Sequence, residues 1–210
     1  YSKSGDGQSV DADYSDIKKS IEALQYVSAS SDAESVKFQK QLLGNYLYNT
    51  GLSLYKKDDY ESSSKYMETA YNLSPSDTIN LYYAASMSVN AKQFDRSLAL
   101  YEKLRVIKFT GIEKKMFATN LDTQEKESFT SETLMNISIK AGTHANPVEE
   151  FTKSKFPEII KNIALIYKER GDNVKALEAF AIARADDPES VMLILEEANL
   201  YYLMGEILKF

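Results

Sequence analysis

A pattern of apolar and small residues returns along this chain at a step of 34 residues. Four residues of one segment are matched 34 positions later by four of the next: Tyr60, Ser63, Met67 and Ala70 by Phe94, Ser97, Tyr101 and Leu104. The same order appears again at Asn173, Ala176, Phe180 and Ala183. A period in this range is typical of stacked supersecondary units, each too small to bury its apolar face alone. The chain is therefore predicted to be a repeat protein, and such stacks usually bind other polypeptides.

Each unit is predicted to consist of two helices joined by a turn. Apolar residues recur at spacings of three and four in each half of a unit, which is the periodicity of one helix face. Both halves also carry a small residue, where the paired helices are expected to approach closely: Gly51, Ala85, Ala164 and Ala198 in the first, Ser63, Ser97 and Ala176 in the second. Turn-forming residues separate the halves at Lys57–Tyr60 and Arg170–Asn173. Pro75 and Pro188 stand where a second helix must end.

This order of small, aromatic and proline residues resembles the tetratricopeptide repeat (TPR) family. The resemblance covers roughly residues 44–109 and 157–210, and it implies an all-α solenoid of antiparallel helix pairs. The second unit has Phe109 where the family has proline, and no unit has the family's tryptophan. A fourth unit begins at Ile194 and is truncated at Phe210, before a second helix can form.

The segment before the first unit is predicted to hold one helix of the second type. Tyr14, Ile17, Ile21 and Leu24 repeat its spacing, but Tyr60 follows Tyr14 by 12 residues more than one period. We assign this excess to a long helix from about Asp32 to Lys57, with Ser30 or Ser31 near its N-cap. Residues 1–12 are expected to form a flexible lead-in, residues 13–109 the N-terminal repeats and 157–210 the C-terminal repeats. This organisation suggests a slice of a longer array.

About 45 residues, roughly 110–156, are inserted between the second and third units. They predict a small β-hairpin of 116–119 and 127–130, then a short helix over 132–141 with Ser131 as its N-cap, and a polar loop over 143–153. The insertion is expected to recognise a partner or, alternatively, to cover an edge of the stack. A similar hairpin insertion occurs in TPR proteins of the bacterial cell envelope. The resemblance therefore implies a periplasmic or cell-envelope location, with the cytoplasm as the alternative.

The composition excludes several classes of function. A net charge of −6 argues against nucleic-acid binding, which needs clustered Lys and Arg. No apolar run approaches the roughly 20 residues that span a bilayer. With no cysteine and one histidine, a zinc site is not expected, and no other metal or cofactor is predicted.

Catalytic signatures are also sparse. His144 has no carboxylate beside it in the sequence, so we expect a structural role for it. The neighbouring acids Glu149 and Glu150, like Glu196 and Glu197, are expected to be solvated. An enzyme is therefore the least expected function.

The TPR resemblance also implies a binding site, because the first helices of successive units line a concave groove in that family. The residues expected to face this groove and bind a partner are Asn45, Tyr48, Leu52, Tyr55, Ile79, Tyr82, Lys161, Leu165, Lys168, Leu195, Asn199 and Tyr202. Tyrosine is favoured at interfaces because it combines a large apolar ring with a polar tip. Burial of these tyrosines by neighbouring helices is the alternative.

Some TPR proteins grip a carboxylate at the C-terminus of a peptide, but the corresponding positions here hold Tyr48, Leu52 and Tyr83. That clamp is absent, so an apolar or aromatic peptide, or a helix, is the expected ligand. The second functional hypothesis is self-association through the C-terminal end, where Tyr201, Leu203 and Met204 have no predicted cover.

Overall fold

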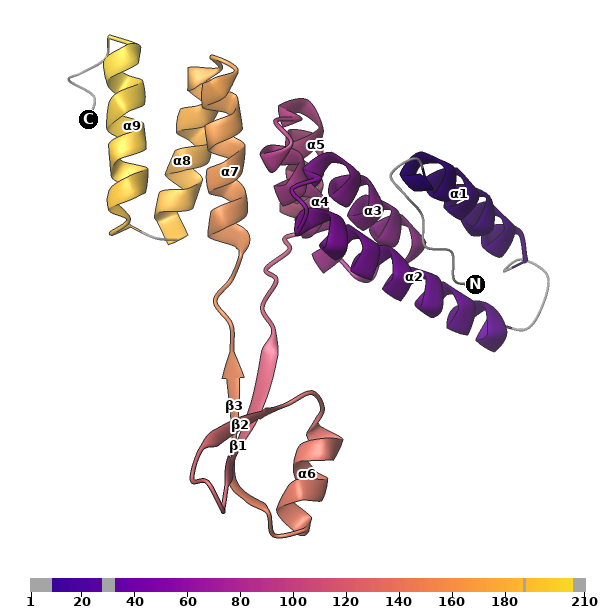
Figure 1. Cartoon of the computed structure of the whole chain (residues 1–210). Helices are drawn as coiled ribbons and strands as arrows, with labels where there is room; N and C mark the ends of the chain where they lie inside the picture. The colour runs from indigo at the N-terminus through magenta and orange to yellow at the C-terminus, as the bar shows by residue number, and fades with distance from the viewer. Residues whose placement is uncertain (1–8, 28–32, 187, 206–210) are drawn as a thin grey trace. The chain divides into compact units, whose positions relative to one another are not determined.

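The computed structural model describes residues 9–27, 33–186 and 188–205. The chain divides into two compact units, Tyr1–Leu100 and Tyr101–Phe210. The first unit contains α1 (Ser9–Val27), α2 (Ala33–Tyr55), α3 (Tyr60–Leu73) and α4 (Ile79–Asn90), and α5 (Phe94–Val106) begins in it. Figure 1 shows α2 and α3 as an antiparallel pair, followed by α4 and α5.

The N-terminal part differs from the expectation in one respect. Helix α1 begins at Ser9, so the predicted lead-in over 1–12 is wrong for residues 9–12. Acidic residues such as Asp11 are favourable in the first turn of a helix, and they therefore extend it rather than precede it. The long helix α2 was predicted, whereas the proposed N-cap at Ser30 or Ser31 lies outside the described residues.

The core of the first unit is formed where α1, α2 and α3 meet. Ile17 of α1 packs with Leu47 of α2 and with Tyr66 and Leu73 of α3. The Tyr14 hydroxyl lies 2.9 Å from Thr69 Oγ1 on α3. Helix α1 thus contacts the pair α2–α3 through the apolar spacing that predicted it.

The small residues of the repeat bring paired helices close together, as predicted. Ser63 Oγ donates a hydrogen bond to the Gly51 carbonyl at 2.8 Å, and Ser97 Oγ donates to the Ala85 carbonyl at 3.0 Å. A Cβ atom at Gly51 would lie 3.0 Å from Met67 Cε, so the α2–α3 contact suits glycine there. The same 12-residue relation therefore closes both helix pairs of the first unit.

In the second unit, α7 (Phe156–Glu169) and α8 (Asn173–Asp186) form the next helix pair, and α9 (Val191–Leu203) packs on α8. Ala164 and Ala176 are buried at the pair's close approach, together with Phe180. Helix α8 ends before Pro188, and α3 ends before Pro75, as the prolines predicted.

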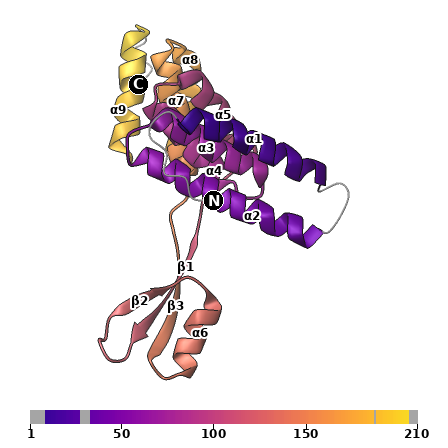
Figure 2. The same ribbon diagram turned by 45° about the vertical axis from the view of Figure 1, so that its right-hand side comes forward.

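The insertion folds as a three-stranded antiparallel sheet with one helix. Its elements are β1 (Lys114–Asn120), β2 (Lys126–Phe129), α6 (Glu132–Lys140) and β3 (His144–Phe151), and the strand order is β2-β1-β3. The hairpin and the short helix were predicted, and Ser131 Oγ accepts a hydrogen bond from the Leu134 N–H as the expected N-cap. Helix α6 contacts all three strands (Figure 2).

The predicted loop over 143–153 is wrong, because most of it is strand β3. Pro147 and Asn146 led to the loop assignment, since proline cannot donate to a strand ladder. Here β3 is an edge strand, its register shifts opposite Phe117–Thr119, and Asn146 has a positive φ of 52°. Edge strands and bulges are the places where a sheet tolerates proline.

Candidate functional site

Three tyrosines gather on the first helices of successive repeats. Tyr48 comes from α2, and Tyr82 and Tyr83 come from α4. The rings of Tyr48 and Tyr83 have centroids 6.2 Å apart at an interplanar angle of 49°, and those of Tyr82 and Tyr83 are 5.7 Å apart at 59°. Tilted pairs at these distances are favourable because the positive edge of one ring approaches the negative face of another. We call Tyr48, Tyr82 and Tyr83 the tyrosine cluster.

The members of the cluster differ in how much surface they present. Tyr82 is only 7% exposed, so its ring acts mainly in packing, which is the alternative weighed for it from the sequence. Tyr48 and Tyr83 are half-buried, and each keeps part of its ring at the surface. The tyrosine that best complements Tyr48 is thus Tyr83, one residue away from the position that the 34-residue step selects.

Other predicted groove residues of the first unit surround the cluster. Leu52 and Ile79 are half-buried, and Asn45 is exposed. Tyr55 is exposed at the end of α2 and packs on Tyr60 at a centroid distance of 5.8 Å. These residues carry no formal charge, so the surface around the cluster offers aromatic, aliphatic and amide contacts.

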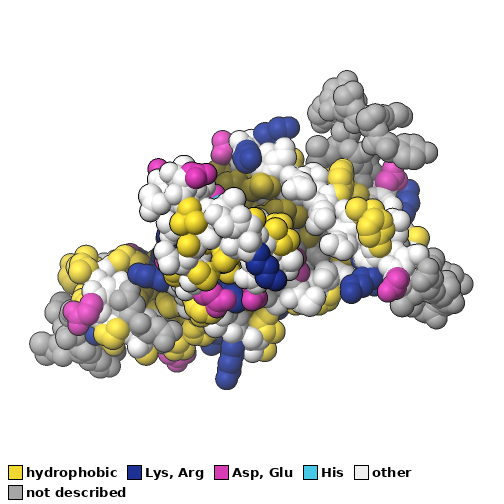
Figure 3. Space-filling view, turned by 90° about the horizontal axis from the view of Figure 1, so that it is seen from below, with side chains coloured by type: hydrophobic (Ala, Val, Ile, Leu, Met, Phe, Trp, Pro, Cys, Tyr) yellow, Lys and Arg dark blue, Asp and Glu magenta, His cyan; other side chains and the backbone are white. Residues whose placement is uncertain are grey.

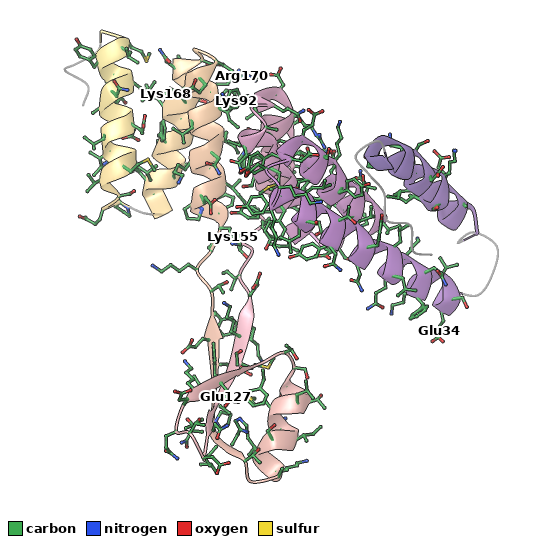
Figure 4. All side chains as sticks on the ribbon, in the orientation of Figure 1. Glu34, Lys92, Glu127, Lys155, Lys168 and Arg170 are labelled. Carbon is green, nitrogen blue, oxygen red and sulfur yellow. The ribbon has the colours of Figure 1, made fainter. Side chains whose placement is uncertain are left out.

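The predicted site residues of the second unit lie on α7 and α9. Lys161, Leu165 and Lys168 of α7 are half-buried. Lys168 Nζ lies 2.5 Å from Glu196 Oε2 on α9, so its ammonium already joins two helices (labelled in Figure 4). On α9, Asn199 is exposed, and Leu195 and Tyr202 are 63% and 68% exposed.

The insertion contains a polar network centred on His144. Alternate residues of a strand and directly paired residues share one face of a sheet, which places Asn120, Glu127 and His144 together. His144 Nε2 lies 3.1 Å from Glu127 Oε2, and Asn120 Nδ2 donates to Glu127 Oε1 at 2.7 Å. The hydrogen bond from His144, with that from Asn120, lowers the pKa of Glu127 below its ordinary value of 4.5.

This network gives His144 a carboxylate partner that its sequence neighbours lack. Glu127 is 17 residues away, and only the strand pairing brings it to the imidazole. The Thr143 hydroxyl lies 2.9 Å from His144 Nδ1 and donates to the Ser138 carbonyl at 3.0 Å. Because that hydroxyl proton is already committed, the arrangement ties the α6–β3 turn to the sheet.

The expectation that the paired acids are solvated is wrong for both pairs. Glu149 and Glu150 form ion pairs with Lys114 and Lys126, respectively, across the sheet. Glu197 is 6% exposed and accepts from Arg184 Nη1 at 2.5 Å, which joins α9 to α8. Neighbouring residues on a helix point in different directions, so Glu196 and Glu197 reach cations on two different helices.

Two searches were confined to the described part of the chain. Residues 9–27, 33–186 and 188–205 include no group of three His, Cys, Asp or Glu side chains that could hold a metal ion. Within those same ranges, no helix is long and apolar enough to cross a membrane.

Comparison with known proteins identifies the fold. No family model matches the chain, and no curated protein sequence matches it. Among solved structures, MamA of strain AMB-1 has a TM-score of 0.52 and 12% identity, covering 96% of this chain and 80% of that one. A second MamA crystal structure has a TM-score of 0.50 and 11% identity, covering 98% and 88%. The helix pairs therefore have the TPR-like solenoid fold, and the predicted fold class is confirmed.

Proposed function

We propose that this protein is a non-catalytic interaction scaffold that binds a partner protein on the tyrosine face of α2 and α4. The observation that carries the proposal is the contact of Tyr48 with Tyr83 across two successive repeats, with both rings partly exposed. Tyrosine in such a position gives a large contact area at a small cost in conformational entropy.

The chemistry of this face favours one class of ligand. Tyr48, Tyr83, Leu52 and Ile79 are partly exposed and uncharged, so they suit apolar or aromatic side chains rather than phosphate or carboxylate groups. The ligand is accordingly an apolar or aromatic peptide, or one face of a helix. Lys161 and Leu165 of α7, and Leu195, Asn199 and Tyr202 of α9, belong to the same proposal as the corresponding first-helix faces of the second unit.

Two side chains separate this proposal from a packing role. Replacing Tyr48 and Tyr83 together by alanine should weaken capture of the partner about tenfold or more, because aromatic anchors dominate interface energies. Tyr82 is left intact, since truncating a buried ring would create a cavity and destabilise the repeat. The measurement is quantitative pull-down from extracts of the source cells, with each captured protein compared between wild type and variant.

The matched control is Asn72→Ala on α3, an exposed position on a second helix. It should capture the same proteins as the wild type. If the double tyrosine variant, folded as judged by circular dichroism, captures every partner at wild-type levels, the tyrosine face is not the binding site.

Self-association through the C-terminal end is the second candidate, because α9 presents several exposed apolar side chains. Val191, Leu195, Tyr202 and Leu203 are each at least 60% exposed. Light scattering of the wild type and of the Leu195→Glu plus Tyr202→Glu variant tests it. A difference in mass between the two supports this candidate, and equal masses reject it.

The proposed location is the periplasm or cell envelope, with the cytoplasm as the alternative. Fractionation of cells that express the full-length protein from its own gene distinguishes them.

A further inference from the structure

Helix α2 carries an exposed stripe that the repeat pattern does not explain. The helix spans 23 residues, about 34 Å, whereas its partner α3 has 14. Its N-terminal turns, which precede the first repeat, expose Phe38 (58%) and Leu42 (48%). The right-hand part of Figure 3 shows apolar side chains beside basic and acidic ones over this end of the first unit.

The stripe has the spacing of a coiled-coil seam. Phe38, Leu42, Asn45, Asn49 and Leu52 follow one another at alternating steps of four and three residues. A 4-3 alternation defines the a and d positions that face a second helix in a coiled coil. Four of these residues are exposed and Leu52 is half-buried, and the opposite face of α2 is occupied by Leu47 in the core. We call these five residues the α2 seam.

We propose that the α2 seam pairs with the α2 seam of a second copy of this chain, in antiparallel orientation. The two-fold axis passes at Asn45. This arrangement places Phe38 opposite Leu52 of the second copy, so the ends of each seam bury an apolar pair. It also places Asn45 against its own copy, where two amides hydrogen-bond and fix the register, as buried asparagine does in coiled coils.

Charge complementarity selects this occupant. Glu34 stands one turn before Phe38, and Lys56 stands one turn after Leu52 (Glu34 is labelled in Figure 4). In the antiparallel pairing, Glu34 of one copy lies opposite Lys56 of the other, and the two-fold symmetry repeats this pair. A parallel pairing would set Glu34 against Glu34 and Lys56 against Lys56. A closed isologous contact of this kind uses the same surface twice.

The inference goes beyond the proposed function, because Phe38 and Leu42 lie outside the predicted groove. With three heptads and two polar seam positions, the pairing is expected to be weak, in the micromolar range. Sedimentation velocity over a concentration series should show reversible self-association of the wild type. Phe38→Glu plus Leu42→Glu should be monomeric throughout the series.

Three controls distinguish this contact from other surfaces. Leu195→Glu plus Tyr202→Glu on α9 and Tyr48→Ala plus Tyr83→Ala in the tyrosine cluster should self-associate like the wild type. A wild type that is monomeric throughout overturns the proposal. So does self-association that the α9 variant abolishes, because that result assigns the contact to α9.

Charge reversal and cross-linking test the register directly. Glu34→Lys should weaken the dimer about tenfold, and Glu34→Lys plus Lys56→Glu should restore it, since the pairs are then reversed but complementary. Because the chain has no cysteine, Asn45→Cys provides a single thiol at the proposed axis. Mild oxidation should link two copies, while Asn72→Cys on α3 should remain unlinked. Failure of the double charge variant to restore association, or of Asn45→Cys to cross-link, overturns the antiparallel register.

Discussion

At the residue scale, one position in each helical turn has a left-handed backbone. Asp58 and Lys92, which are 34 residues apart, have φ values of 60° and 57°, and Gly171 and Gly205 occupy the corresponding position in the second unit with 74° and 70°. A non-glycine residue costs about 1–2 kcal/mol in this region because Cβ approaches the following carbonyl oxygen. The same turn is therefore strained in one unit and relaxed in the other.

Lys92→Gly is expected to raise the free energy of unfolding by about 0.5–1 kcal/mol, because the relieved strain exceeds the extra entropy of glycine in the unfolded chain. Gly171→Ala is the reverse experiment, and should lower it by about 1 kcal/mol. A Cβ atom at Gly171 meets no atom within 4 Å, so only the backbone conformation is tested. Urea unfolding followed by circular dichroism measures both, and changes of the same sign would contradict the explanation.

A second residue-scale prediction concerns acid. The folded state lowers the pKa of Glu127, chiefly through the hydrogen bond from His144. The carboxylate therefore stabilises the sheet at pH values above its unfolded pKa, near 4.5, and this contribution is lost as the pH falls through the lower folded value. Amide hydrogen exchange in β1 and β2 should show that protection decreases below about pH 4.5 in the wild type.

Glu127→Gln should remove that component of the acid response, because an amide does not titrate in this range. The variant should show the weaker protection at neutral pH as well. An unchanged acid profile in Glu127→Gln would show that other carboxylates control the sheet.

At the scale of elements, α9 is held to its unit by charges as well as by apolar contacts. Glu197 is buried in the interface with α8, while its partner Arg184 is 39% exposed at the side chain. Removing the arginine leaves a buried carboxylate without its cation, whereas removing the glutamate leaves a cation that can reach water.

Arg184→Ala is therefore expected to cost about 2–3 kcal/mol, less than a fully buried pair because Arg184 is partly solvated. Arg184→Met plus Glu197→Met should cost under about 1 kcal/mol, since both charges are removed and the apolar contact is kept. Hydrogen exchange of the α9 amides, compared between the two variants, checks the order. Equal effects would contradict the role of the buried carboxylate.

At the scale of the whole molecule, the insertion leaves and rejoins the repeats at adjacent points. The Lys155 N–H donates to the Thr110 carbonyl at 2.6 Å, and the Thr152 N–H donates to the Glu113 carbonyl at 2.9 Å. Because the two connecting segments are paired, their ends can be joined without moving the helices on either side. We propose that residues 110–156 form a module separate from the repeats.

Replacing residues 114–151 by a short Gly-Ser linker is expected to preserve the repeats. The shortened chain should keep cooperative thermal unfolding and the helical circular dichroism signal of the remaining helices. Loss of cooperativity would show that the repeats need the insertion to fold, and the proposed domain boundaries would then be wrong.

Local rules account for most of the fold that could be predicted. The helix pairs, their small-residue contacts, the prolines after α3 and α8, and the N-cap Ser131 all depend on residues close together in the sequence. Strand β3 was missed because Pro147 is acceptable only at an edge or a bulge, and edge position is a property of the assembled sheet. The partners of His144, Glu196 and Glu197 were missed because side chains meet across elements.

The sequence by itself determined that this chain is a TPR-like stack of helix pairs with an insertion, because the 34-residue period encodes one helix face after another. It also supplied the tyrosines from which a binding face is proposed. Only the tertiary structure decided which of them remain accessible: Tyr82 is buried, while Tyr48 meets Tyr83 at the surface. Exposure depends on which neighbouring helices cover a side chain, and a repeat pattern specifies the face of a residue without specifying its cover.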